Sequence, residues 1–246
     1  PNKTPTPYPS KQAVALTTAQ LVSLETQDFA ALSTNSIAAL LTAQIAALTA
    51  GQIRALTTAQ VQALTNAQLI GLTTAQIESL TTVQVAALTT AQIASLTSDQ
   101  VDGLAPAQLA GLSSAQVNAL NSGTLLSLST LQISGLTTRV IAMLGSAKIA
   151  ALDSAQVAAL STSQLAALSS SGVAGLGTDD LANFSSTELA ALNSRALQAL
   201  TTVQIASLLS AQLTALSSGQ IASLTTAQVA ALNSSQIDGL STAQIA

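Results

Sequence analysis

The sequence predicts an all-α protein, a solenoid of very short helices with one helix in each eight-residue repeat. Three observations support this prediction. A leucine occupies every eighth position from Leu16 to Leu240, with Phe184 as the exception. The residues that follow each leucine have the spacing of a helix N-cap. Charged residues make up only 7% of the chain and avoid half of the positions in the repeat.

The repeat unit is an octad in which the leucine is position zero and the next seven residues are positions one to seven. From Leu21 onward, position five is always Leu, Ile, Val or Phe. Position four is Gln in most octads, and position two is nearly always Ser or Thr. Large apolar residues that recur at a fixed period form the core of repeat proteins. We therefore predict a structural core at positions zero and five, represented by Leu56, Val61, Leu64, Leu88, Ile93, Leu96 and Phe184.

The charged residues indicate how the octad is oriented. Beyond the N-terminal segment they occur only at positions one, three, four and six, as Glu25, Arg139, Asp28 and Arg54 illustrate in that order. An unpaired charge is costly to bury. This pattern predicts that positions one, three, four and six face solvent, and that positions zero, two, five and seven face the interior or a neighbouring octad.

A short helix that restarts in each octad explains the pattern better than one continuous helix. Eight residues advance about 80° beyond two full helical turns, so a continuous helix would spread the leucines over all its faces. Thr57 with Gln60, and Thr89 with Gln92, have the spacing of a capping box. We predict that these residues cap their helices, with Pro106 as a first helical residue in its own octad.

A β-solenoid is the alternative fold. Interior positions five, seven, zero and two alternate as they do in a strand, and the Ser, Thr and Gln positions would form rows along stacked strands. The alternation breaks once in each octad, because the leucine directly follows interior position seven. The abundance of Ala, Leu and Gln also favours helices.

Two segments are expected along the chain. Residues 1–12 contain four prolines and are predicted to be an extended tail, with Tyr8 as a possible subunit contact. Residues 13–246 are predicted to be a continuous octapeptide solenoid, a segment of a longer array or a filament subunit. One octad buries too little apolar surface to offset the entropy lost on ordering it, so each octad must be stabilised by its neighbours.

Composition argues against several classes of protein. A net charge of −4 with six basic residues does not suit nucleic-acid binding. Polar residues interrupt every apolar run, so no membrane-spanning segment is expected. The chain has no His and no Cys, which removes the commonest general base and the thiolate metal ligands. We expect no enzymatic activity, no catalytic residues and no cofactor.

The octads between about 121 and 200 are the least regular. Their acidic residues Asp179, Asp180 and Glu188 are weak candidates for a metal site, because calcium prefers several carboxylate oxygens. A solvated acidic face is the simpler interpretation of these three residues. The irregular stretch itself is either neutral variation in a redundant array or a surface for a protein partner.

The octad Leu-Thr-Thr-Ala-Gln-Ile-Ala-Ser at residues 88–95 resembles the octapeptide tracts found in large secreted or surface proteins of bacteria. The resemblance covers residues 13–246 and carries over no functional residue. It implies an extracellular or cell-surface location and a structural function as a fibre, filament or adhesin-like stalk. Self-association is the partner interaction that this function implies.

Two other functions remain open from the sequence. Regularly spaced Thr residues suit a module that binds ice or another periodic surface, although position one varies too freely for a uniform hydroxyl lattice. A solenoid scaffold that binds a protein partner is the other alternative.

Overall fold

A computed structural model describes residues 10–245, and the whole of this part of the chain consists of short helices and their connections. The predicted all-α solenoid is confirmed, because residues 10–245 contain a helix in each octad and no strand. The first helix begins at Ser10, within the segment predicted to be a tail. Tyr8, the predicted subunit contact, lies outside the described residues.

The chain divides into two compact units, Pro1–Ser127 (unit 1) and Leu128–Ala246 (unit 2). Their helices have four to six residues each. In unit 1 they are α1 (Ser10–Ala15), α2 (Thr18–Val22), α3 (Thr26–Ala30), α4 (Thr34–Ala39), α5 (Thr42–Ala46), α6 (Ala50–Ala55), α7 (Thr58–Ala63), α8 (Asn66–Ile70), α9 (Thr74–Ser79), α10 (Thr82–Ala87), α11 (Thr90–Ser95), α12 (Ser98–Asp102), α13 (Pro106–Ala110), α14 (Ser114–Ala119) and α15 (Ser122–Leu126). In unit 2 they are α16 (Thr130–Gly135), α17 (Thr138–Met143), α18 (Ser146–Ile149), α19 (Ser154–Ala158), α20 (Thr162–Ala167), α21 (Ser170–Val173), α22 (Thr178–Asn183), α23 (Ser186–Ala191), α24 (Ser194–Ala199), α25 (Thr202–Ser207), α26 (Ser210–Thr214), α27 (Ser218–Ala222), α28 (Thr226–Ala230), α29 (Ser234–Asp238) and α30 (Thr242–Ile245).

In most octads the polar residues cap the first turn of a single helix. In α7, the side chain of Thr57 accepts a hydrogen bond from the backbone N–H of Gln60, and the Gln60 side chain accepts one from the backbone N–H of Thr57. The last turn tightens, with the Leu64 N–H bonded to the Val61 carbonyl at 3.2 Å. A capping box at the start and a tight last turn satisfy part of the backbone that so short a helix leaves unpaired.

Two extended residues separate α6 from α7. Leu56 has φ −58° and ψ 133°, and Thr57 has φ −70° and ψ 159°. Other octads repeat this pair, and no residue in the described range has a positive φ. The chain therefore changes direction after each helix without the left-handed residue that commonly ends longer helices.

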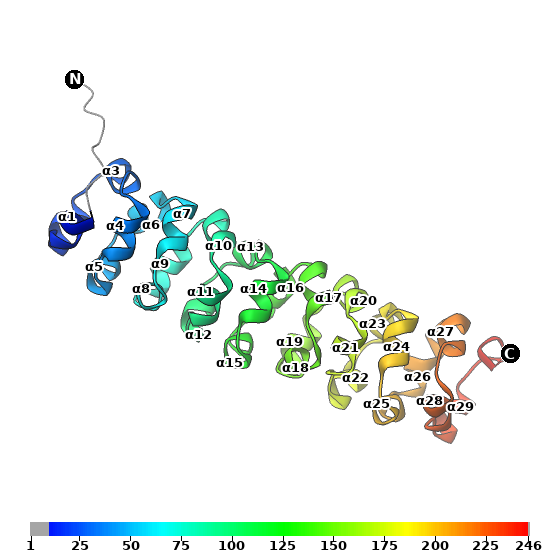
Figure 1. Cartoon of the computed structure of the whole chain (residues 1–246). Coiled ribbons are helices and arrows are strands. Elements are labelled where there is room, and N and C mark those ends of the chain that lie inside the picture. The colour runs from blue at the N-terminus through cyan, green and yellow to red at the C-terminus, as the bar shows by residue number, and fades with distance from the viewer. Residues whose placement is uncertain (1–9, 246) are drawn as a thin grey trace. The chain divides into compact units, whose positions relative to one another are not determined.

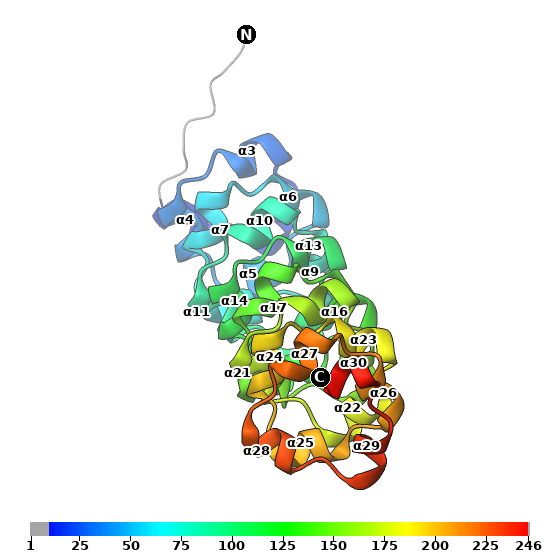
Figure 2. The ribbon, with the colours of Figure 1, turned by 90° about the vertical axis from the view of Figure 1, so that its right-hand side faces the viewer.

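Within each unit the chain winds as a coil in which helices three apart pack together. In unit 1, α7 lies between α4 and α10, as Figures 1 and 2 show. In unit 2, α23 packs between α20 and α26. One turn of the coil thus takes at least three octads.

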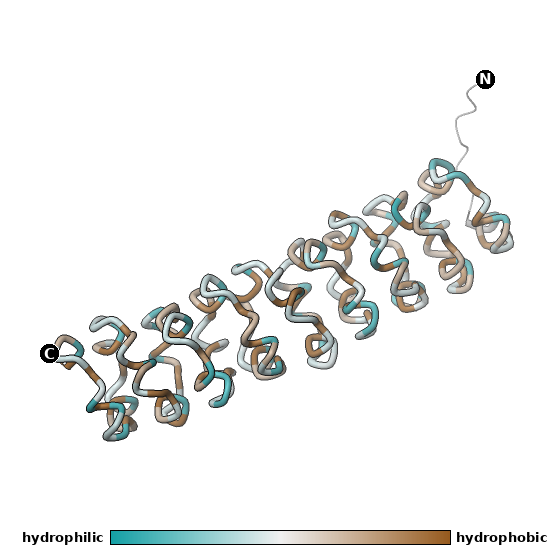
Figure 3. Tube along the Cα trace, turned by 180° about the vertical axis from the view of Figure 1, so that it is seen from behind, coloured by the Kyte–Doolittle hydropathy of each residue, from teal (hydrophilic) through white to brown (hydrophobic). Residues whose placement is uncertain are grey.

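The core of each unit consists of the residues at positions zero and five. The predicted core residues are at most 6% exposed, and Phe184 has the largest of these values. Hydrophobic and hydrophilic residues alternate at short intervals along the chain, as Figure 3 shows. None of the helices in residues 10–245 has the length and apolar character that crossing a bilayer requires.

Two parts of the predicted orientation are wrong. Position two is exposed, as at Thr58 and Thr90, because it is the first helical residue and its side chain points outward. Position four is buried: Gln60 and Gln92 are each 2% exposed. A neutral amide can be buried where a charge cannot, provided that its donors and acceptor are all paired.

The partners of the buried glutamines lie in the preceding turn of the coil. The Nε2 of Gln68, in α8, donates to the carbonyl oxygens of Ile37, Ala38 and Leu40 at the end of α4. Its Oε1 accepts a hydrogen bond from the N–H of Thr65, the N-cap of its own helix. We call this arrangement a glutamine bridge. Because the glutamine reaches the end of the fourth helix back while helices three apart pack together, one turn takes between three and four octads.

We predict that Gln92→Ala lowers the free energy of unfolding of unit 1 by about 2–4 kcal/mol. The substitution removes the bonds from Nε2 to the carbonyls of Val61, Gln62 and Leu64 and leaves those of Val61 and Leu64 buried without this donor. The measurement is a urea titration followed by circular dichroism. Gln27→Ala is the control, since Gln27 is exposed. Equal effects of the two substitutions would show that the bridge contributes no stability.

Candidate functional site

Four consecutive octads of unit 2 lack the glutamine bridge. Their position-four residues are Gly172, Asp180, Glu188 and Ala196. On either side of them the bridge is present: Gln164 donates to the Leu136 carbonyl at 2.8 Å, and Gln204 donates to the Leu176 carbonyl at 2.8 Å. We call these four octads the glutamine gap. Because a turn takes between three and four octads, the gap spans one full turn of the coil.

Asp180 replaces glutamine in the first turn of α22. Its Oδ2 accepts a hydrogen bond from the backbone N–H of Gly177 at 3.2 Å, which is the capping function of the glutamine Oε1. Its Oδ1 is buried and has no hydrogen-bond partner in the described structure. A carboxylate has no donor for the carbonyls of the preceding turn. Asp180 therefore caps its own helix without linking it to the turn before.

Glu188 replaces glutamine in α23 in the same way. Its Oε2 accepts hydrogen bonds from the backbone N–H and the hydroxyl of Ser185, both at 2.7 Å. The Ser185 hydroxyl in turn accepts a hydrogen bond from the Glu188 N–H at 3.2 Å. The capping box is complete, but an ionised carboxylate offers no proton to a carbonyl. Glu188 keeps the local half of the bridge and loses the half between turns.

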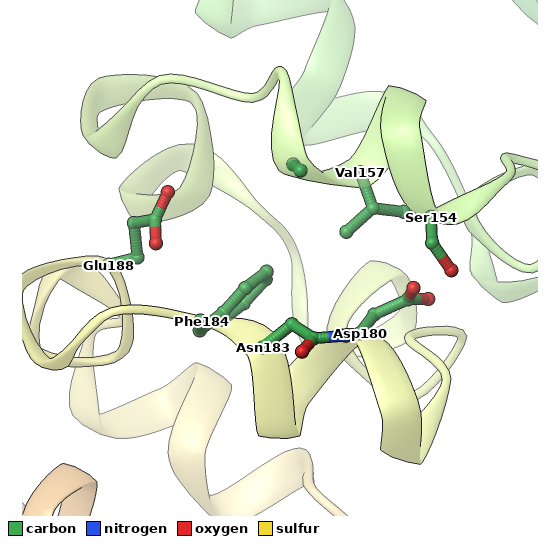
Figure 4. A pocket seen from close by; sticks show the side chains of 7 residues that line it. Ser154, Val157, Asp180, Asn183, Phe184 and Glu188 are labelled. Atoms are coloured by element: carbon green, nitrogen blue, oxygen red, sulfur yellow. The ribbon is translucent and has the colours of Figure 1, made fainter.

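A small hollow of about 30 Å³ lies beside the two carboxylates. In Figure 4 the Phe184 ring points into it toward Val157, with Asp180 and Glu188 on either side. A hollow of this size has room for about two water molecules. The hollow is lined by Ser154, Val157, Ala158, Asp180, Asn183, Phe184 and Glu188.

The two outer octads of the gap compensate for the missing glutamine bridge in different ways. A Cβ on Gly172 would lie 3.0 Å from the Leu144 carbonyl oxygen, so the backbone of α21 packs directly on the preceding turn. Near Ala196, the side-chain amide of Asn193 donates to the Ala166 carbonyl at 3.2 Å. The middle two octads, those of Asp180 and Glu188, combine a lost donor with a hollow.

The three acidic candidates for a metal site occupy different places. Asp179 is exposed at position three, whereas Asp180 and Glu188 are half-buried caps of their own helices. Within residues 10–245 no group of three or more His, Cys, Asp or Glu side chains could hold a metal ion. Asp180 and Glu188 accept hydrogen bonds from backbone N–H groups at the start of their own helices and line the same hollow.

The predicted capping residues have a second partner that sequence reasoning missed. Thr57 and Thr89 accept hydrogen bonds from the N–H of Gln60 and Gln92, as in a capping box. Gln60 also donates to the Leu32 carbonyl at 2.7 Å. The signal for this second function was the recurrence of Gln, a residue with both a donor and an acceptor, at position four of most octads.

A family model described as the ALTTAQ repeat matches this chain in nine segments that together cover more than half of it. The match confirms that the chain is a tract of repeats. No curated protein matches the chain. The matched segments are residues 21–58, 42–74, 50–82, 61–98, 74–106, 141–170, 173–210, 197–226 and 218–246.

We predict that Glu188→Gln raises the free energy of unfolding of unit 2 by about 1–2 kcal/mol. The amide keeps the capping acceptor and adds a donor for the carbonyls at the end of α19, as Gln204 does for the end of α21. The urea midpoint measures the change. Glu78→Gln is the matched control, because it removes the same charge from an exposed side chain at position six. If the urea midpoint rose equally in both variants, the gain in stability would come from the loss of a negative charge alone.

Proposed function

The chain belongs to the ALTTAQ repeat family, and we propose that it is a non-catalytic structural scaffold, an extracellular fibre or stalk built from stacked octads. The observation that supports this proposal is the glutamine bridge. In each unit it joins a helix to the turn before it, so that the bridged turns have the same relation to their neighbours. Such a protein can be lengthened by adding octads without changing any contact already made.

The distribution of bridges supports a scaffold whose stability accumulates with length. In unit 1 each bridge places one donor on backbone carbonyls 28 to 31 residues earlier. No long-range contact beyond neighbouring turns is needed for the core. The bridging glutamines of unit 1 are Gln44, Gln52, Gln60, Gln68, Gln76, Gln84, Gln92, Gln100, Gln108 and Gln116.

The extracellular or cell-surface location is part of the proposal. Its support is the resemblance of the octad to tracts in large secreted or surface proteins of bacteria. Protease treatment of intact cells that make the protein tests the location: a surface protein is degraded, whereas an internal marker protein is not. Protection of the chain to the same degree as the marker would contradict it.

Self-association is also proposed, and its support lies in α28–α30. There the position-five residues Val229, Ile237 and Ile245 are 48%, 45% and 64% exposed, although inner turns bury this position. With neighbouring leucines they line an open apolar hollow of about 410 Å³. We propose that the turn formed by α1–α3 of a second copy stacks on this surface, because it repeats the contact between successive turns.

We predict that a copy of residues 49–96 inserted after Leu96 lengthens the folded protein and raises its thermal stability, because the insertion adds whole octads in phase. Small-angle X-ray scattering measures the maximum dimension and circular dichroism the melting temperature. The control is a copy of residues 53–96 at the same place, which shifts the leucines by half an octad. If the in-phase insertion left the maximum dimension unchanged, the scaffold proposal would fail.

We predict that Ile237→Glu weakens self-association, because it places a charge on the apolar surface of α28–α30. Sedimentation velocity over a range of concentrations measures the distribution of oligomers. Val203→Glu introduces the same charge at an apolar residue that is 68% exposed at position three, and it serves as the control. A chain that is monomeric at every concentration, or one that both variants affect equally, contradicts stacking through this surface.

A further inference from the structure

We infer that the glutamine gap is a built-in opening point of unit 2, where the turn containing α22 and α23 separates from α19 and α20 before neighbouring turns come apart. The inference concerns local stability and goes beyond the proposed scaffold function. It depends on three features of the middle octads of the gap: the absent donors, the unpaired carboxylate oxygen and the hollow.

The first feature is the loss of hydrogen bonds between turns at two adjacent octads. In a bridged octad such as that of Gln212, Nε2 donates to the carbonyls of Leu181 and Phe184 at 2.7 Å each. By the same spacing, Asp180 faces the end of α18 and Glu188 faces the end of α19, and neither carries an amide. Each hydrogen bond between turns contributes to their association only while the turns are in contact. Its absence therefore favours the open state.

The second feature is the cost of closing the turn around Asp180. Its Oδ1 is buried without a partner, whereas in an open turn water would hydrate it. Burial of an unsatisfied polar atom destabilises the closed arrangement specifically. The charge on Asp180 thus acts in the same direction as the lost donors.

The third feature is the hollow between the turns. Space beside Phe184 and Val157 means that these side chains lack part of the contact that a filled interior supplies. At the outer octads of the gap, the close approach of Gly172 and the amide of Asn193 restore contact with the preceding turn. Opening is therefore confined to the region around α19, α22 and α23.

Unit 1 contains a matched region with intact bridges. Gln84 and Gln92 lie twelve octads before Asp180 and Glu188 and donate to the carbonyls of Leu56 and Leu64. The segments 53–64 and 82–95 correspond, octad by octad, to the segments 149–160 and 178–191. The two regions differ in the bridge residues at their centres, which makes them suitable for comparison within one molecule.

Hydrogen exchange of the whole chain, followed by mass spectrometry, tests the inference. We expect segments 149–160 and 178–191 to exchange at least about tenfold faster than segments 53–64 and 82–95. The double variant Asp180→Gln with Glu188→Gln should remove this difference, because it restores both amide donors and the hollow leaves space for the longer side chain at position 180. Equal rates in the unchanged chain, or no slowing in the double variant, would overturn the inference.

A transplanted gap provides a second, independent test. The double variant Gln84→Asp with Gln92→Glu should make the backbone amides of segments 53–64 and 82–95 exchange at least about tenfold faster. The exchange rates of segments 149–160 and 178–191 should stay unchanged. Helix content measured by circular dichroism shows whether the variant remains folded. A folded variant with unchanged exchange in unit 1 would overturn the inference even if the first double variant failed to fold.

Discussion

The hydrogen-bonding capacity of one glutamine side chain is the constraint on which both units depend. A helix of four to six residues leaves most of its N–H and C=O groups without an intrahelical partner. The glutamine at position four supplies an acceptor to the N-cap of its own helix and donors to the carbonyls at the end of another helix, as Gln68 does for Thr65 and Leu40. Glutamate can supply only the acceptor, aspartate is also shorter, and alanine supplies neither. The residue at position four therefore determines whether a helix is hydrogen-bonded to the preceding turn of the coil.

The same interaction explains why such short helices persist. Isolated helices of this length are unstable in water, because nucleation costs more than a few hydrogen bonds return. Here the apolar residues at positions zero and five bury one face of each helix, and the bridge satisfies polar groups that this burial removes from water. Packing and hydrogen bonding are thus coupled in each bridged octad. Neither is complete until the next turn is in place, which makes the turn, and not the helix, the unit of stability.

Much of this fold could be predicted from the sequence, since period, capping box and apolar positions are all local patterns. Thr57 with Gln60 identified the helix start, and the leucines identified the core. The burial of position four could not be predicted from the distribution of charged residues. Octads with a charged residue at position four lack the glutamine bridge, so they do not represent the bridged octads. Asp28, Lys148, Asp180 and Glu188 are the charged residues at position four that suggested exposure. Nor could local spacing reveal the partners of the glutamines: which carbonyls they meet depends on the number of octads in a turn, and that number is set by packing between turns.

The four octads of the glutamine gap are adjacent, and their adjacency affects the stability of unit 2 more than their number does. In a repeat array each joint between turns is stabilised mainly by its immediate neighbours. Four missing bridges scattered over the chain would weaken four joints slightly, and each would still be supported by intact bridges on both sides. Gly172, Asp180, Glu188 and Ala196 instead occur in consecutive octads, so their losses fall on one turn. Because the free energy of opening a joint decreases with every bond it lacks, adjacent substitutions concentrate their effect on the one turn that carries them.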